Sequence, residues 1–239
     1  MPDHILIEMM SPGFVLWRCL HDGPLTRESI ESFRPGTKMD WDRYRRRNLP
    51  LLTALMETYG ACGVVALDAG SVVGLIRFYP KEVLTMTGAG EMCMQQFFPA
   101  GPQDGFAWSA FPPLENLTDR TLVVHCLGVG KTGGGKDEPY QRKGIGTRMA
   151  RKLIEWAKQN GWQAIEANAN CDLPSLYQFT GSAGKRFWEK LGFRVVATGH
   201  GHFPDPNHPF VAQIRKEAVE AGIDPALATV NFTMRLDLA

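Results

Sequence analysis

The stretch from Thr121 to Gly161 constrains this chain most, because its pattern predicts a strand, a glycine-rich loop and a helix in that order. Thr121–Leu127 is an apolar run of strand length that is rich in β-branched residues. From Ile145 onward apolar residues recur at close to helical spacing, and Asn160-Gly161 ends the helix. A crossover helix of this kind implies that the next predicted strand, Trp162–Ala169, runs parallel to the first.

The start of this helix carries the clearest chemical signal. Its residues 141–147 read Gln-Arg-Lys-Gly-Ile-Gly-Thr. Unpaired backbone N–H groups point outward at a helix N-terminus, and Gly144 and Gly146 would let an anion approach the main chain. Arg142 and Lys143 place positive charge where the helix dipole disfavours it, and a bound phosphate would reverse that cost. The segment therefore predicts a pyrophosphate site.

Two nucleotide-binding motifs compete for the same loop. Gly128–Gly133 spells G-x-G-x-x-G directly after a strand, as in dinucleotide-binding folds. That motif needs a helix to open within it, whereas residues 133–139, Gly-Gly-Gly-Lys-Asp-Glu-Pro, do not propagate one. Gly130–Lys136 has the Walker A spacing, but Asp137 stands where a serine or threonine would bind magnesium. Both motifs fit the chain less well than a third motif in the same segment.

The third motif is Q/R-x-x-G-x-G/A, present as Gln141–Gly146. Leu127-Gly128-Val129 precedes it, and Phe187–Phe193 follows it as F-W-E-K-L-G-F. In this order and spacing, the three segments resemble parts of the GCN5-related N-acetyltransferase (GNAT) superfamily. They are similar to its acyl-coenzyme A-binding turn, the L-x-V end of its fourth strand and its F-Y-E-K-L-G-F signature. The resemblance covers Ala61–Pro80 and Thr121–Thr198.

The resemblance implies an α/β fold of the GNAT type, with a mixed, mostly antiparallel twisted sheet, a parallel central strand pair and flanking helices. We expect residues 1–239 to form a single domain with an insertion at about 81–120 and a C-terminal elaboration at about 199–228. The insertion is rich in Met, Phe, Gly and Pro, and structureless loops of this length are usually functional. Either it packs as an irregular flap over the acceptor site, or it forms a subunit contact in a homodimer.

The other expected elements come from periodicity and turn chemistry. The hairpin Gly63–Phe78 turns at Asp-Ala-Gly-Ser. The remaining elements are a first strand around Phe14–Trp17, a helix beginning at Thr26, a helix Asp40–Tyr59 broken at Asn48–Pro50, a long connection Asn170–Ser182, a helix Ala183–Leu191, a strand Phe193–Ala197, a loop Gly199–Pro209, a helix Phe210–Ala221 and a final strand Thr229–Leu236.

Composition limits the partners of the chain. A net charge of +1 gives no bulk attraction to nucleic acid or to an anionic membrane. The five cysteines are scattered and odd in number, which is typical of reduced thiols in the cytoplasm. The N-terminal residues do not read as a signal peptide, and no apolar run reaches membrane-spanning length. His200, His202 and His208 are separated by prolines with no nearby cysteine, so no metal site is predicted.

The resemblance also implies the activity: transfer of an acetyl group from acetyl-CoA to a small-molecule or peptide amine, by direct attack in a ternary complex. The strands before and after the crossover helix would splay apart, so that main-chain groups could bond the pantetheine arm. The implied cofactor-binding residues are Leu127, Val129, Gln141, Arg142, Lys143, Gly144, Ile145, Gly146, Thr147 and Trp188.

His125 is the first candidate for the general base. Strand alternation predicts that it shares a face with Leu127 and Val129, beside the cofactor. It is similar in position to a histidine two residues before L-x-V in the arylalkylamine N-acetyltransferases, and the unperturbed pKa of a histidine suits proton abstraction near neutrality. The alternative is a hydrogen-bonded core histidine. Glu166, on the next strand, is the second candidate and would act through water.

The general acid is less clear, because Trp188 stands where most family members carry a tyrosine. An indole N–H donates a hydrogen bond but does not deliver a proton. Protonation of the leaving thiolate would then come from Tyr177, Cys171 or solvent. The same substitution also fits a non-catalytic domain that binds and senses acyl-CoA.

Overall fold

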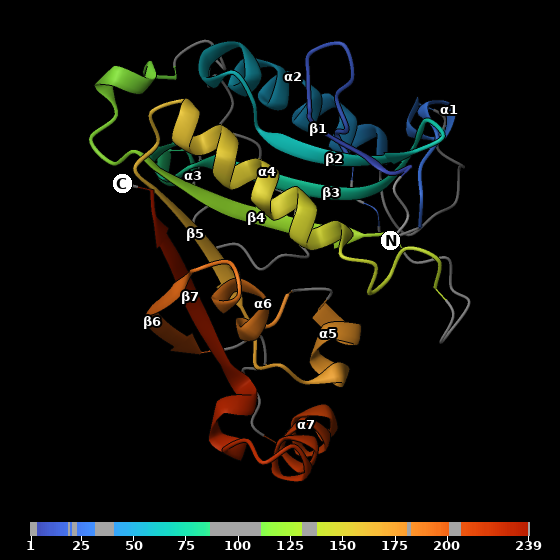
Figure 1. The fold of residues 1–239 in the computed structure, drawn as a ribbon, viewed down its shortest axis with the longest axis vertical. Coiled ribbons are helices and arrows are strands. Elements are labelled where there is room, and N and C mark those ends of the chain that lie inside the picture. Colours follow the sequence, from blue (N-terminus) through green and yellow to red (C-terminus); the bar gives the residue numbers. More distant parts are fainter. Residues whose placement is uncertain are drawn as a thin grey trace.

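The computed structural model describes residues 4–18, 20, 23–31, 41–86, 111–130, 138–180, 183–200 and 207–238. These residues contain a seven-stranded sheet with the spatial order β1-β2-β3-β4-β5-β7-β6 (Figure 1). Its strands are β1 (Leu6–Met9), β2 (Gly63–Asp68), β3 (Ser71–Pro80), β4 (Thr121–Val129), β5 (Ala164–Ala169), β6 (Arg194–His200) and β7 (Val230–Asp237). The helices are α1 (Arg27–Glu31), α2 (Trp41–Tyr59), α3 (Lys81–Met86), α4 (Ile145–Gln159), α5 (Pro174–Thr180), α6 (Lys185–Glu189) and α7 (Pro209–Glu220), with short 3-10 helices η3 (Leu114–Asn116) and η5 (Pro225–Thr229).

Strand directions confirm the predicted fold class. Neighbouring strands are antiparallel except for β4 and β5, which run parallel with Thr121 opposite Ala164. The helix α4 makes the crossover between them, as the pattern of apolar residues predicted. The hairpin β2–β3 is also confirmed. Its two turn residues, Ala69 and Gly70, have φ of 46° and 83°, as a two-residue hairpin turn with the twist of its strands requires.

Helix α4 covers one face of the sheet and packs on β1 to β4 (Figure 1). Gly74 of β3 makes this approach close, because a Cβ there would lie 2.9 Å from the Met149 Cε. Further along β3, the rings of Phe78 and Trp156 lie 5.3 Å apart. The Cα–H of Gly74 that a Cβ would replace and the side chain of Phe78 therefore face α4, and the side chains of Arg77 and Tyr79 point to the other face of the sheet.

The opposite face carries the N-terminal segment and, beyond it, α2. The buried Arg77 donates from Nη2 to the carbonyls of Leu16 and Arg18 at 2.8 and 3.2 Å. Asn48 of α2 donates to the Trp17 carbonyl at 3.0 Å. The first strand was predicted around Phe14–Trp17, and this was wrong. That segment is apolar because it is buried under the sheet, whereas the strand itself is Leu6–Met9.

The predicted break of α2 at Asn48–Pro50 is also wrong, since the helix runs continuously from Trp41 to Tyr59. Pro50 removes one backbone hydrogen bond. The following residues Leu51, Leu52 and Leu55 are each at most 1% exposed, and their burial outweighs that loss. Tertiary packing here overrides a local helix-breaking signal.

The structure describes the two ends of the predicted insertion, residues 81–86 and 111–120, while residues 87–110 lie outside the described residues. Glu82 of α3 accepts from the Thr118 hydroxyl and from the Asp119 N–H, both at 2.6 Å. The chain therefore returns beside the point at which it leaves the sheet. Whether the segment between forms a flap or a subunit contact concerns residues that are not described.

The C-terminal third adds elements that the sequence did not predict. The connection 170–182 contains the helix α5, which rests on a second, smaller core. That core consists of Cys171, Leu173, Leu176, Ile214, Ala218 and Ala228. It joins α5 to α7 and η5. Of the three histidines for which no metal site was predicted, His208 caps α7: its Nδ1 accepts a hydrogen bond from the Phe210 N–H at 3.2 Å. His202 lies outside the described residues.

Helices in the described ranges are too short or too polar to cross a bilayer. The same residues hold no group of three or more His, Cys, Asp or Glu side chains placed to bind a metal ion.

Candidate active site

The centre of the sheet opens between β4 and β5. Their parallel pairing ends at Val124 opposite Ala167, although β4 continues to Val129. On its other side β4 stays paired with β3 as far as Gly74 opposite Val129. The strands thus diverge at their C-terminal ends and form a fork, where one edge of residues 125–129 has no partner among the described strands. The predicted splay is present.

Main-chain groups of β4 face this fork in a regular alternation. The Gly130 N–H donates to the Val73 carbonyl at 2.8 Å, so residue 130 points its main-chain groups toward β3. Because main-chain groups alternate along a strand, the N–H and C=O groups of Leu127 and Val129 point the other way, toward the fork. Of these, the Val129 carbonyl accepts a hydrogen bond from Gln141 Nε2 at 2.7 Å. The main-chain N–H and C=O of Leu127 also point toward the fork, and no described strand pairs with them there.

Helix α4 begins beside the fork with an uncapped N-terminus. Its N-cap residue is Gly144, which has φ of 76° and makes no capping hydrogen bond, and its first turn holds no acidic residue. Arg142 also has a positive φ, of 57°, and both Arg142 and Lys143 are exposed. The start of α4 thus combines backbone N–H groups without a side-chain cap and two exposed cationic residues, which are the features that an anion site requires.

The second glycine of the motif faces inward instead. A Cβ at Gly146 would lie 3.7 Å from the Phe187 ring and 3.8 Å from Leu127 Cδ2. These are ordinary van der Waals distances, so Gly146 faces Leu127 and Phe187 and a small side chain would fit there. Sequence reasoning did not single out Phe187; the only sign of it was the residue before Trp188 in the F-W-E-K-L-G-F segment.

Tyr177 lies against the same loop. Its hydroxyl donates to Gln141 Oε1 at 2.8 Å, while Gln141 Nε2 donates to the Val129 carbonyl. Burial raises the pKa of Tyr177, and the nearby Arg142 opposes this in part. The hydroxyl thus holds the side chain of Gln141 in one orientation, which the sequence did not predict. Cys171, the other proposed acid, is buried in the second core, and burial raises the pKa of its thiol.

His125 occupies an irregular position in β4. Pairing shifts from Arg77 opposite Cys126 to Phe78 opposite Val124, so His125 is the extra residue of a β-bulge. Its ring lies 5.3 Å from that of Tyr79, on the face away from α4. The prediction that His125 shares a face with Leu127 was therefore wrong, because the bulge breaks the alternation between them.

The environment of His125 disfavours its protonated form. Both ring nitrogens are buried. Burial, followed by the positive charge of Arg77, lowers the pKa of His125 from 6.5 to about 4. The imidazole is thus neutral at physiological pH and able to accept a proton, but it is a weaker base than an exposed histidine.

Glu166 of β5 is held by two cations. Its carboxylate lies 2.9 Å from Lys81 Nζ and 2.8 Å from Arg235 Nη1, and the residue is only 8% exposed. Lys81 begins α3, so this ion-pair group fixes the start of the insertion to the sheet. Because the Glu166 carboxylate is held in these two ion pairs, a separate role as a general base is disfavoured.

Trp188 is 1% exposed and packs between two aromatic rings. Its ring lies 4.9 Å from those of both Phe187 and Phe193. Its Nε1 is buried and has no hydrogen-bond partner among the described residues. The indole of Trp188 is therefore a core side chain next to Phe187, and its N–H makes no hydrogen bond with the described residues.

Comparison with known proteins identifies the family. A model of the Acetyltransferase (GNAT) family matches residues 25–193. The chain belongs to this family. No curated protein matches the chain. The family assignment agrees with the fork and the uncapped helix, and it supports an acyltransferase.

Several solved structures resemble this GNAT protein. Ard1 from Thermoplasma volcanium is 13% identical with a TM-score of 0.46, covering 99% of each chain. A GCN5-related N-acetyltransferase from Kribbella flavida is 17% identical with a TM-score of 0.45, covering 100% of each chain. A GNAT family acetyltransferase from Elizabethkingia anophelis with acetyl-CoA bound is 14% identical with a TM-score of 0.40, covering 99% of each chain.

Proposed function

We propose that the protein transfers an acetyl group from acetyl-CoA to a small-molecule or peptide amine by direct attack in a ternary complex. The observation that carries this proposal is the end of β4–β5 pairing at Val124, next to the uncapped start of α4 at Gly144. An acyl-CoA needs both features: main-chain partners for its amide-bearing arm and an anion site for its pyrophosphate.

The residues present fit this co-substrate. The N–H groups of residues 144–147 would bind the pyrophosphate, with Arg142 and Lys143 adding positive charge. The main-chain groups of Leu127 would bond the pantetheine arm. Val129 contributes indirectly, since its carbonyl holds Gln141 in place.

The chemistry requires two proton transfers. The amine nitrogen attacks the thioester carbonyl, the C–N bond forms, and the C–S bond breaks with its electron pair on sulfur. The amine loses its proton to His125, whose imidazole is neutral at physiological pH. Solvent protonates the thiolate, because the indole of Trp188 does not deliver a proton. Glu166 acting through water is the second choice of base.

Two observations favour a second function, that of an acyl-CoA sensor without turnover. Trp188 is buried where related proteins are expected to carry a tyrosine hydroxyl, and Tyr177 uses its hydroxyl on Gln141. No side-chain acid is then assigned. A thiol-release assay across a panel of amines separates the two functions, because a sensor binds acetyl-CoA but releases no thiol above the rate of spontaneous hydrolysis.

Binding itself is tested at Gly144. We expect Gly144→Glu to abolish acetyl-CoA binding in calorimetry, because it puts a carboxylate and a side chain where the pyrophosphate would lie. Gly222→Glu is the matched control: it places the same residue at a similar φ of 68°, at the end of α7. Equal affinities of both variants and wild type would place the acyl-CoA site elsewhere and refute the proposal.

We further propose that the described elements belong to one domain of residues 1–239, and that the insertion 81–120 contributes to the acceptor site or to a homodimer contact. A cytoplasmic location and the absence of nucleic-acid partners remain predictions from composition.

A further inference from the structure

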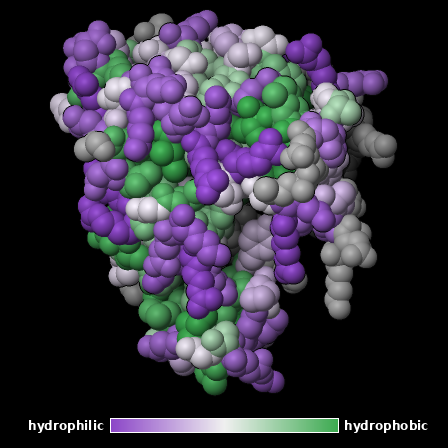
Figure 2. Space-filling view, viewed as in Figure 1, coloured by the Kyte–Doolittle hydropathy of each residue, from purple (hydrophilic) through white to green (hydrophobic). Residues whose placement is uncertain are grey.

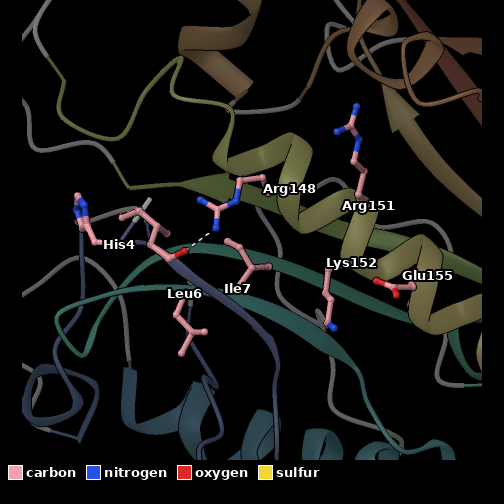
Figure 3. Close-up of a pocket in the computed structure, with 8 residues that line it drawn as sticks. His4, Leu6, Ile7, Arg148, Arg151, Lys152 and Glu155 are labelled. Atoms are coloured by element: carbon pink, nitrogen blue, oxygen red, sulfur yellow. Dashed lines mark hydrogen bonds between the residues drawn. The ribbon is translucent and has the colours of Figure 1, made fainter. Parts of the chain in front are cut away.

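A groove of about 580 Å³ lies between β1 and the outward side of α4, at the edge of the sheet remote from β6 (Figure 3). It is separate from the fork between β4 and β5. Hydrophilic side chains gather on this face of the molecule, with apolar surface between them (Figure 2). The groove combines an open strand edge on one wall with cationic side chains on the other.

The strand wall is β1, which pairs only with β2 among the described strands. The Met10 N–H donates to the Gly63 carbonyl at 2.8 Å, so alternate residues Ile5 and Ile7 turn their main-chain groups outward. The Ile5 carbonyl accepts from Arg148 Nη2 at 2.6 Å (Figure 3). The N–H and C=O of Ile7 come next along this edge, and no described residue bonds them.

The helix wall is rich in positive charge. It carries Arg148, Arg151 and Lys152 against one carboxylate, Glu155. Neither Arg151 nor Lys152 forms a hydrogen bond or an ion pair within the described part of the chain. In Figure 3, Lys152 extends from α4 toward β1, whereas Arg151 points to the other side of the helix. Lys152 is therefore the cation best placed for a group that lies on the strand edge.

We propose that the groove receives an extended acidic segment of another polypeptide, which adds to β1 as a further strand. Main-chain bonds to Ile7 would supply the pairing, and a carboxylate of the segment would lie against Lys152. A second copy of this chain fits poorly, since antiparallel pairing of two β1 strands would bring two sets of Arg148 and Lys152 together. This inference stands apart from the proposed acetyl transfer.

The test is fluorescence anisotropy with two libraries of labelled 12-residue peptides. One library alternates glutamate with valine, threonine or isoleucine, and the other replaces each glutamate by lysine. We expect members of the acidic library to bind the full chain and the lysine library not to bind. Lys152→Glu should weaken the best acidic peptide about tenfold, because it turns an attraction into a repulsion. Lys158→Glu, on the same helix outside the groove lining, should change affinity less than twofold.

The strand contact is tested from both partners. Ile7→Pro removes the outward N–H and should weaken binding about fivefold, whereas Ile7→Val keeps that N–H and should not. Should the proline variant fail to fold, N-methylation of the peptide's alternate amides removes the same pairing without touching the protein. The proposal is overturned if no acidic peptide binds, if Lys152→Glu behaves as Lys158→Glu, or if N-methylation has no effect. Displacement by inorganic phosphate with no effect of N-methylation would instead indicate a simple anion site.

Discussion

The hydroxyl of Tyr177 offers the sharpest test of how this site is built. The structure uses it to orient Gln141, and the sequence suggested it as a general acid. Tyr177→Phe removes one neutral hydrogen bond of 2.8 Å and leaves the ring in place. Such a bond is worth about 0.5–1.5 kcal/mol. If Tyr177 acts through Gln141, KM for acetyl-CoA should rise about two- to tenfold while kcat stays nearly constant.

Double-mutant analysis shows whether the effect travels through Gln141. We expect Tyr177→Phe to have no further effect once Gln141→Ala is present, since the partner of the hydroxyl is gone. Tyr140→Phe is the matched control, because its hydroxyl donates to Asp68 Oδ2 at 2.8 Å and not to Gln141. Its effect should add to that of Gln141→Ala.

The assay is steady-state thiol release over pH 6 to 10 with acetyl-CoA varied at a fixed amine concentration. A general acid predicts a different result: kcat would fall about 10²–10⁴-fold in Tyr177→Phe, and the loss of rate at high pH would disappear. That outcome, with KM unchanged, would refute the positioning role of Tyr177.

The other predictions concern three residues with distinct surroundings. His125 has a pKa of about 4 in the folded protein against 6.5 for an unperturbed histidine, so this residue alone should lower the stability of wild type by about 3 kcal/mol as pH falls from 6.5 to 4. Urea unfolding measures this loss. The His125→Gln variant should lose less stability than wild type over the same pH range, and equal losses in the two proteins would contradict a buried, neutral His125 ring. Glu166→Gln should lower stability by about 2 kcal/mol, because it weakens the bonds to Lys81 and Arg235, and should change kcat little. A large drop in kcat at unchanged stability would instead show that Glu166 acts as a base. Trp188→Phe should cost about 1–2 kcal/mol of stability and keep most turnover, and a collapse of kcat would show that the indole N–H acts in the transition state.

Much of the fold could be predicted because its signals are local and periodic. The strand before Gly128, the helix from Ile145 and the hairpin at Gly70 each follow from apolar spacing and turn chemistry within about twenty residues. The start of α4 at Gly144 could be predicted as easily, since a helix start and two flanking cations can be read in seven residues; the anion site there stays a prediction.

The failures depend on contacts between distant segments. Leu16 and Trp17 look like a strand but lie under the sheet, where Arg77 binds the Leu16 carbonyl across 61 residues of chain. Pro50 should break a helix, yet buried leucines after it hold the helix together. The face of His125 was predicted wrongly because a bulge depends on the register between two strands, which no single strand specifies.

The C-terminal elaboration gains a role from the same long-range contacts. Glu217 of α7 accepts from the Ser175 N–H at 3.3 Å, and Gln213 donates to the Ser175 hydroxyl at the same distance. These contacts and the second core hold the start of α5, and α5 carries the Tyr177 hydroxyl that orients Gln141. Gln141 in turn occupies the Val129 carbonyl at the fork. A side chain on α7 is thus joined to residues 141–147 by a continuous series of contacts through α5. If residues 141–147 bind the co-substrate as proposed, we expect this added segment to support that binding.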